Sequence, residues 1–453
     1  MALSDGFRAF VCGLLFVASV SLGVPTAAAA PGNISWVSRF TELGSGGDSA
    51  QMVLVAPDGA AVYVTRYAFN GGESGYDYAT VALDASTGSV LWSDGYDGLG
   101  GYDSGCCSAL SPDGSSLYVT GASRTPGRGL GWATVAYDAA TGARRWVARL
   151  NRPTRAQEVP HSIQVGSDGR IFVTGRISED FRTVVYDTEG RRLWASRYRS
   201  WESQAIVVAP DGRRVFVTGT TYDGDLMTLA HRAEDGHRLW ADRYDSGKDD
   251  TACCLAISPD GSTVYVESRG QGRREYSDTF GTLAYDAASG TVRWTARFPG
   301  GFAFPSDIAV SPSGELVHVT GRGQQHASNS TYATVTYDAA SGMEVWRASF
   351  DGTDHVPSDA QSMALGPDGT VYVTGQSGSF DYGGHPEIAT VAYAPLTGVA
   401  RWVSTYNDPP GGYTFGVSIA VAPGGSHVFV TGRSAEVLDS SEEDFLTLAL
   451  QTS

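Results

Sequence analysis

The stretch ATVAYDAATGARRW, residues 133–146, decides the fold, because near-copies of it recur along the whole chain. Related stretches begin at residues 79, 182, 227, 281, 333 and 389, and a shortened copy, LTLALQ, begins at residue 446. A second kind of half-unit precedes each copy, and ALSPDGSSLYVTG at residue 109 is one example. Self-similarity at a regular period indicates a repeat architecture.

Each half-unit consists of two short runs rich in Val, Thr and Tyr around a Gly-containing turn, which is typical of a β-hairpin. One unit therefore predicts four antiparallel strands, and the average unit of about 52 residues suits a propeller blade. The last unit lacks its outermost strand, while ISWVSRF, residues 34–40, has that strand's pattern without belonging to a unit. Placing it beside residues 445–450 completes the last blade and leaves no open sheet edge. The sequence thus predicts an all-β, eight-bladed β-propeller closed by its N-terminal strand.

The first 30 residues have the pattern of a secretory signal. Arg8 precedes an apolar run over residues 10–24, and small residues that end at Ala30 offer a cleavage site. The apolar run is shorter than the ~20 residues that span a membrane. We therefore expect a signal peptide over residues 1–30, a propeller over residues 31–453, and export to the extracellular space, or to the periplasm if the host has an outer membrane.

Composition narrows the class of partner. The chain of 453 residues carries a formal net charge of -17. Such an acidic chain is unsuited to binding the phosphate backbone of nucleic acid. The classes of partner that remain are cations, neutral sugars and basic proteins. We expect a monomer without a transmembrane anchor in the mature chain that binds a protein, glycan or cell-wall ligand.

The repeat separates scaffold residues from functional ones, because a residue present in most blades serves the fold. Trp132 shares its register with Tyr78, Phe280 and Tyr332, so we assign it to the scaffold. A threonine that recurs on the third strand of each blade is assigned to packing. Eight further tryptophans recur in one register and are predicted to dock against neighbouring blades: Trp36, Trp92, Trp146, Trp194, Trp240, Trp294, Trp346 and Trp402.

The tryptophan-bearing half-unit resembles the quinoprotein repeat, the A-x-D-x-x-T-G-x-x-x-W motif of pyrroloquinoline quinone (PQQ) dehydrogenases and of related eight-bladed scaffold proteins. The stretches ALDASTGSVLW at residue 82 and AYDAATGARRW at residue 136 match it closely. The resemblance covers nearly all of the chain after residue 30 and implies a quinoprotein alcohol dehydrogenase-like propeller. The same repeat builds enzymes and non-enzymes, so function must come from the site.

The loops predict which face binds. The turns within each hairpin are short and uniform, whereas the connections at the other end of the blades differ, among them SRGQGRREYSDTF at residue 268 and QSGSFDYGGHPEI at residue 376. Variable loops on a rigid scaffold commonly carry binding sites. The candidate ligand-binding residues lie where the inner strands start on this face, around the predicted channel mouth: Gln51, Cys106, Cys107, His161, Gln204, Cys253, Cys254, Asp307 and Gln361.

Four cysteines remain after Cys12 leaves with the predicted signal, and they form two adjacent pairs at equivalent positions of blades two and five. Inner strands spaced by at least ~4.8 Å give a ring radius of roughly 6 Å, so three blade steps separate the pairs by ~11 Å. A disulfide needs Cα atoms within about 7 Å. In an oxidising compartment we expect two vicinal disulfides, Cys106 with Cys107 and Cys253 with Cys254.

In quinoprotein alcohol dehydrogenases a vicinal disulfide covers the cofactor, so the resemblance implies PQQ and calcium as cofactors here. After Cys107, however, the chain reads SALSPDG instead of the Asp/Asn/Arg run of that family. No residue matches the family's calcium ligands, catalytic Asp or cofactor-contacting Arg, and the alternative role of the two disulfides is to staple rigid loops. The acidic loops TYDGDL at residue 221 and DSSEEDF at residue 439 lack EF-hand spacing and are interpreted as solvated carboxylates.

Two hypotheses follow. The first is a secreted, non-enzymatic propeller that presents a variable acidic face to a protein, glycan or cell-wall ligand, with no assured cofactor and no assigned catalytic or metal-binding residue. The alternative is a PQQ- and calcium-dependent dehydrogenase of alcohols or sugars. The first is favoured because the scaffold pattern is complete and no catalytic motif is recognisable.

Overall fold

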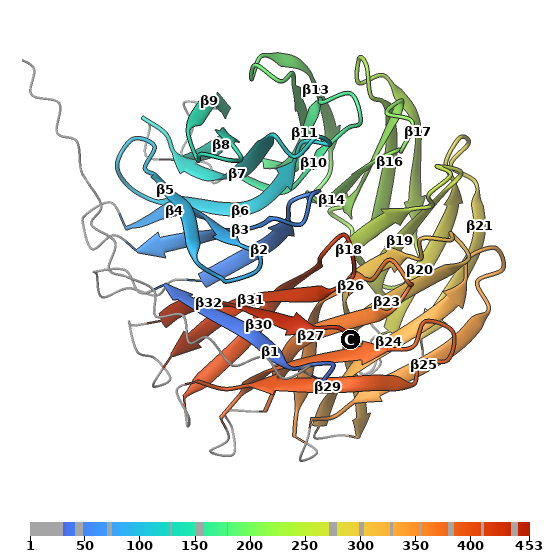
Figure 1. Ribbon diagram of the computed structural model, residues 1–453. Helices are drawn as coiled ribbons and strands as arrows, with labels where there is room; N and C mark the ends of the chain where they lie inside the picture. The colour runs from blue at the N-terminus through green and yellow to red at the C-terminus, as the bar shows by residue number, and fades with distance from the viewer. Residues whose placement is uncertain are drawn as a thin grey trace, which may run out of the picture.

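The Val-, Thr- and Tyr-rich runs form four-stranded antiparallel sheets, and the computed structural model arranges eight of these sheets around a common centre (Figure 1). The structure describes residues 30–40, 49–69, 75–126, 129–150, 158–178, 180–270, 279–298, 303–326, 329–352, 356–378, 385–408, 412–435 and 443–453. Residues 1–29 of the predicted signal peptide lie outside these ranges. The predicted all-β, eight-bladed propeller is confirmed.

The strands follow the chain in order within blades one to seven. Blade one comprises β2 (Ser49–Val55), β3 (Ala61–Phe69), β4 (Tyr76–Asp84) and β5 (Val90–Tyr96), and blade two comprises β6 (Asp103–Leu110), β7 (Ser116–Arg124), β8 (Leu130–Asp138) and β9 (Arg144–Leu150). Blade three comprises β10 (Val159–Val165), β11 (Ile171–Ile177), β12 (Asp180–Tyr186) and β13 (Arg192–Arg199), and blade four comprises β14 (Glu202–Val208), β15 (Arg214–Thr220), β16 (Leu226–Arg232) and β17 (Arg238–Tyr244). Blade five comprises β18 (Asp250–Ile257), β19 (Thr263–Gly270), β20 (Thr279–Asp286) and β21 (Val292–Phe298), and blade six comprises β22 (Phe304–Val310), β23 (Leu316–His326), β24 (Asn329–Asp338) and β25 (Glu344–Phe350). Blade seven comprises β26 (Ser358–Leu365), β27 (Val371–Ser377), β28 (Glu387–Tyr393) and β29 (Ala400–Tyr406). Blade eight comprises β30 (Tyr413–Val421), β31 (His427–Ala435) and β32 (Glu443–Gln451), and its outermost strand is β1 (Ile34–Phe40). First strands of neighbouring blades contact each other, so they line the centre.

The N-terminal strand closes the ring. β1 pairs antiparallel with β32, and Phe40 lies opposite Phe445 with the two rings stacked at 4.5 Å between centroids. β32 extends beyond the predicted residues 445–450 by two residues at its start and one at its end. Because the first strand completes the last sheet, neither chain end leaves an open edge at the junction.

The recurring tryptophans lie in the seams between blades. Trp36 of blade eight donates its indole N–H to the carbonyl oxygen of Ala85 in blade one, at 3.0 Å. The same bond to the next blade is made by Trp92, Trp146, Trp194, Trp240, Trp294 and Trp346. Trp402 packs against Gly32, the corresponding glycine ahead of β1. Each indole thus ties its blade to the following one.

The turn glycine beneath each indole is required for two reasons. Gly88 has a φ of +71°, in the left-handed region that favours glycine, and a Cβ there would lie 2.5 Å from Cε3 of Trp36. The T-G pair of the repeated motif therefore combines a turn with a flat surface for the neighbouring blade's tryptophan.

The hydrophobic core is divided among the seams. Between blades one and two, for example, Tyr78 packs with Leu117 and Val119. The recurring third-strand threonines also form hydrogen bonds within blades, as between Thr134 and Thr120 at 3.1 Å. Packing alone was therefore an incomplete interpretation of these threonines. The described residues contain no helix of the length and apolarity needed to cross a membrane.

Candidate functional site

Each innermost strand carries a β-bulge near its start, at the ring of positions predicted for the channel mouth. In β6, for example, the pairing register shifts between Gly105 and Cys107. A bulge places two consecutive residues opposite one residue of the partner strand. The eight bulged residues are Gln51, Cys106, His161, Gln204, Cys253, Ser306, Gln361 and Val417.

The bulges explain how adjacent cysteines can be joined inside a strand. In a regular strand, consecutive side chains point to opposite faces of the sheet. At the bulges the structure joins Cys106 to Cys107, with Cα atoms 3.7 Å apart, and Cys253 to Cys254, with Cα atoms 3.8 Å apart. No disulfide bond joins one pair to the other in the part of the chain that the structure describes.

The disulfides lie in seams between blades. The Cys106 sulfur is 3.3 Å from the carbonyl oxygen of Pro160 in blade three, and the Cys253 sulfur is 3.4 Å from the carbonyl oxygen of Pro305 in blade six. A disulfide sulfur has no proton to donate, so these are close contacts and not hydrogen bonds. Both pairs therefore contribute to the junction with the next blade.

Two other bulged residues reach the corresponding carbonyl oxygen of the next blade, and they do so by hydrogen bonds. His161 has its Nδ1 2.7 Å from the carbonyl oxygen of Ser203, which assigns the N–H to Nδ1, and Ser306 donates its hydroxyl to the carbonyl oxygen of Ala360 at 2.8 Å. In each case the acceptor is the residue before the next blade's bulge. A ring predicted to bind ligand therefore also connects blades.

The remaining predicted ring residues differ in accessibility. Gln361 is exposed, whereas Gln51 and Gln204 are half-buried. The carboxylate of Asp307 accepts hydrogen bonds from the backbone N–H of Met363, at 2.9 Å, and of Ile308. Desolvation raises the pKa of Asp307 to about 6. Because the bond from Met363 ties β22 to β26, the Asp307 carboxylate serves the scaffold.

A cavity of about 410 Å³ opens between blades two and three on the variable face. Cys106 is the one predicted ring residue in the lining of this cavity. The lining also includes one cation, Arg124, and one exposed aromatic ring, Tyr102. Its lining is Tyr102, Ser104, Cys106, Ala122, Arg124, Gly129, Leu130 and Val159. The combination of a sulfur, a ring and a guanidinium suits a small polar or anionic group.

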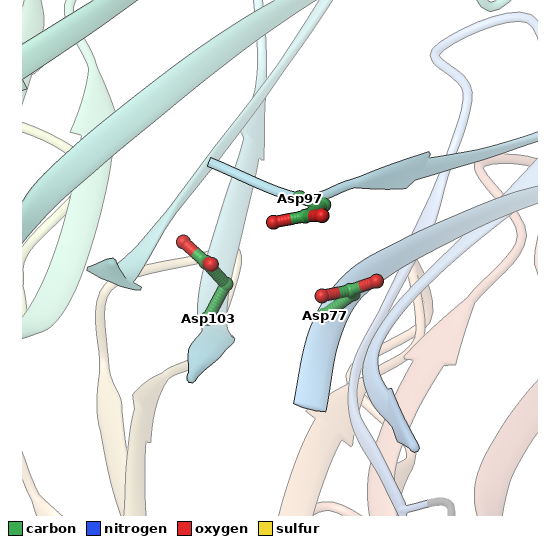
Figure 2. Close-up of side chains that lie close together, drawn as sticks. All are labelled: Asp77, Asp97 and Asp103. Atoms are coloured by element: carbon green, nitrogen blue, oxygen red, sulfur yellow. The ribbon is translucent and has the colours of Figure 1, made fainter. Parts of the chain in front are cut away.

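Carboxylates that could hold a metal ion lie next to this cavity, not in the loops considered from the sequence. Asp77, Asp97 and Asp103 each offer an oxygen within 4.8 Å of the others (Figure 2). Asp225 of the TYDGDL loop is buried in an ion pair with Arg243, so its interpretation as a solvated carboxylate was wrong. In the DSSEEDF loop, residues 439–442 lie outside the described residues.

An exposed aromatic pair on the same face was missed by the sequence reasoning. Trp201, between blades three and four, is 48% exposed, and Tyr222 in the loop after β15 is 44% exposed. Their rings meet edge-on at 5.9 Å, and the Arg176 guanidinium lies 5.8 Å from the Trp201 ring. The available signal was that Trp201 stands outside the repeat register. Trp132, by contrast, is buried and donates to the carbonyl oxygen of Arg176 at 3.3 Å.

The fold and these sites can be compared with known proteins. The Dos1 propeller is 11% identical, with 91% of this chain and 94% of that chain covered and a TM-score of 0.58. Quinohemoprotein alcohol dehydrogenase ADHIIG from Pseudomonas putida HK5 is 11% identical, with 92% and 78% covered and a TM-score of 0.52. BamB from Moraxella catarrhalis is 14% identical, with 96% and 97% covered and a TM-score of 0.46. At 11% identity, the similarity to the Dos1 propeller and to the quinohemoprotein alcohol dehydrogenase shows the fold alone.

Curated protein sequences contain no match to this chain. A family model does match: the PQQ_2 model, described as outer membrane protein assembly factor BamB, covers residues 1–159, 131–274 and 258–439. Because these matches span most of the sequence and the fold is the eight-bladed propeller, the chain belongs to the BamB-like family of PQQ-repeat β-propellers.

Proposed function

We propose that this protein is a secreted binding propeller that holds a protein, glycan or cell-wall ligand on its variable face. The observation that carries the proposal is the exposed pair of Trp201 and Tyr222 with Arg176 beside it. All three residues come from the end of the blades where the connections vary.

Exposure distinguishes this pair from the scaffold aromatics. Trp36 and Trp132 are buried in seams, whereas about half of Trp201 is open to solvent. Keeping large apolar surface in water is unfavourable, and Trp, Tyr and Arg are the residues that most often dominate binding energy. Two rings and a guanidinium on a rigid scaffold therefore suit a ligand that offers both an apolar face and hydrogen-bond acceptors.

Charge supports a neutral or basic partner. The chain carries a formal net charge of -17, which disfavours polyanions. Neutral glycans and basic protein segments both fit this balance, and export would bring the protein to the cell envelope where such ligands occur.

Binding of the mature protein to a glycan panel and to isolated cell-envelope fractions tests this proposal. Trp201→Ala and Tyr222→Ala should each weaken binding about tenfold or more. Leu396→Ala is the matched control, because Leu396 is 69% exposed on the uniform turn between β28 and β29, at the other end of the blades. Equal binding by all four proteins would overturn the proposal.

The alternative, a PQQ-dependent dehydrogenase, is favoured by the disulfide that borders the cavity at Cys106. PQQ carries three carboxylates, and the cavity lining offers one cation, Arg124, with the acidic cluster nearby. These residues do not fit the cofactor, so no step is assigned to it. Dye reduction by the mature protein with added PQQ and calcium, across alcohols and aldoses, would overturn the choice of a binding function if turnover appeared.

A further inference from the structure

The cavity between blades two and three lies where another seam of the propeller holds an ion pair. The counterpart of Ala122 in blade six is Arg322. The counterpart of Val159 in blade seven is Asp359. Arg322 and Asp359 form an ion pair at 3.2 Å across the seam between blades six and seven. In the seam between blades two and three, Ala122 and Val159 are too small to fill this space, and both line the cavity.

The seam between blades five and six fills the same position in another way. There the Arg269 guanidinium lies 3.7 Å from the centroid of the Phe304 ring. These two residues are again the counterparts of Ala122 and Val159. A small residue at this position of the second strand belongs to blade two alone, because the other blades carry Tyr67, Arg176, Thr220, Arg269, Arg322, Gln376 and Arg433. The scaffold therefore does not require the cavity.

Arg124 is the one charged residue in the lining of the cavity. It ends β7, two residues beyond Ala122, and no other blade has an arginine at this position. The side chain is half-buried, and within the described part of the chain its guanidinium makes no hydrogen bond and no ion pair. A guanidinium in this state can donate charge-assisted hydrogen bonds to a ligand.

The backbone ahead of β6 makes room for this arginine. Gly101 is buried and has a φ of +136°, in the left-handed region that favours glycine. A Cβ on Gly101 would clash with Cδ of Arg124 and lie 2.6 Å from its Nη1. The next residue, Tyr102, lines the cavity and is 44% exposed, so its ring is open to an aromatic group of a ligand.

The lining suits a ligand that joins one carboxylate to a small apolar body. A planar guanidinium binds a carboxylate through two parallel N–H···O bonds, and Arg124 offers such a group. The Ser104 hydroxyl, which has no hydrogen-bond partner in the described residues, supplies a further donor. Ala122, Leu130 and Val159 form an apolar wall.

The charge around the cavity favours a ligand with a single negative charge. The lining includes no Asp or Glu among the described residues, so Arg124 makes it locally positive. Asp103 and Glu158 adjoin lining residues in the chain, but both are buried outside the lining. Their negative charge and the net charge of -17 oppose ligands that carry several negative charges.

We propose that this cavity binds a monocarboxylate with a small apolar or aromatic body, with the carboxylate on Arg124 and Ser104 and the body against the apolar wall. The volume of about 410 Å³ falls within the roughly 300–1,000 Å³ of small-molecule sites. The site is separate from the aromatic pair of Trp201 and Tyr222, so it goes beyond the proposed binding function and does not depend on it.

Titration followed by ligand-observed NMR tests this site, with benzoate as the probe and the protein prepared without residues 1–30. Benzoate should bind with a Kd in the millimolar range or tighter. Benzamide, which offers Arg124 no charge, and phthalate, which adds a second carboxylate, should each bind at least tenfold more weakly. A tripeptide that ends in phenylalanine presents the same groups at a peptide C-terminus, and the tighter of the two carboxylates identifies the source of the natural ligand.

The first variant removes the charge. Arg124→Gln should weaken benzoate binding at least tenfold, and it should fold normally because Arg124 makes no hydrogen bond or ion pair in the described residues. The matched control is Arg213→Gln, because Arg213 is exposed on the uniform turn between β14 and β15, at the other end of the blades. This control should bind benzoate as the unmodified protein does.

The second variant fills the cavity without changing its charge. Ala122→Tyr introduces the residue that blade one carries at the same register, so it should abolish benzoate binding while the protein still unfolds cooperatively. Trp201→Ala should bind benzoate normally, which separates a failure of this site from a failure of the proposed binding function. Absence of benzoate binding, equal affinity for benzamide, or unchanged affinity in Arg124→Gln would overturn the proposal.

Discussion

Cys254 lies directly opposite Glu267 in the β18–β19 ladder, whereas the equivalent Cys107 lies opposite Thr120. Seven blades have a threonine at this position of the second strand, so Glu267 is particular to blade five. Its side chain has no exposed surface and accepts a hydrogen bond from Thr282 at 2.7 Å, while its Oε1 has no hydrogen-bond partner. Desolvation raises the pKa of Glu267 to about 8, so the folded protein keeps this carboxyl protonated at neutral pH.

Glu267 should make stability fall with rising pH. From its ordinary value of 4.5 up to about 8, the folded protein holds a proton that the unfolded chain has released. The unfolded state then binds fewer protons, so the free energy of unfolding decreases as pH rises through this window, by on the order of a few kcal/mol. Urea unfolding between pH 5 and pH 9 should show that the free energy of unfolding of the Glu267→Gln variant does not fall in this way as the pH rises. Glu267→Thr, the residue of the other blades, serves as the second variant, and parallel pH profiles for all three proteins would contradict the assignment.

Gly88→Ala should destabilise the junction of blades eight and one. The new Cβ would lie 2.5 Å from Cε3 of Trp36, in addition to the strain of a φ of +71°. We expect a loss of about 2–4 kcal/mol from overpacking and strain together. Gly75→Ala is the control, because its φ is +82° but a Cβ there meets nothing within 4 Å. In thermal unfolding, the Tm of Gly88→Ala should be well below that of Gly75→Ala. Equal Tm values would show that the contact with the indole contributes nothing to stability.

Loss of the closing strand should destabilise the whole ring. Removing residues 31–42 would expose the edge of β32 and remove Trp36 from its contact with Ala85. Trp36→Ala alone should cost about 3–5 kcal/mol, because the indole is almost fully buried. Trp201→Ala is the matched control, since it removes an exposed indole. Chemical denaturation measures the stability of the truncated protein and of the two tryptophan variants. An unchanged midpoint for the truncated protein would refute the closure of the ring by β1.

The oxidised protein, prepared without residues 1–30, should contain no free thiol. Mass spectrometry without reduction should find Cys106/Cys107 and Cys253/Cys254 each lacking two hydrogens within one peptide. Replacing either pair by serine should leave the fold intact, because six blades have the same bulge without sulfur. A peptide cross-linked between the two pairs would contradict the structure.

The sequence by itself determined the blade count, the order of strands and the closure by residues 34–40, because each follows from local hairpin patterns and their repetition. It also paired adjacent cysteines correctly, since ring size alone excludes a bond across the channel. Only the tertiary structure revealed the bulges beneath Cys106 and Cys253, because a register shift depends on the partner strand. Asp77 and Asp103 belong to different blades, and Trp201 meets Tyr222 from a neighbouring loop. Contacts of this kind depend on how whole blades pack, which no local pattern encodes, and they are where the candidate binding sites lie.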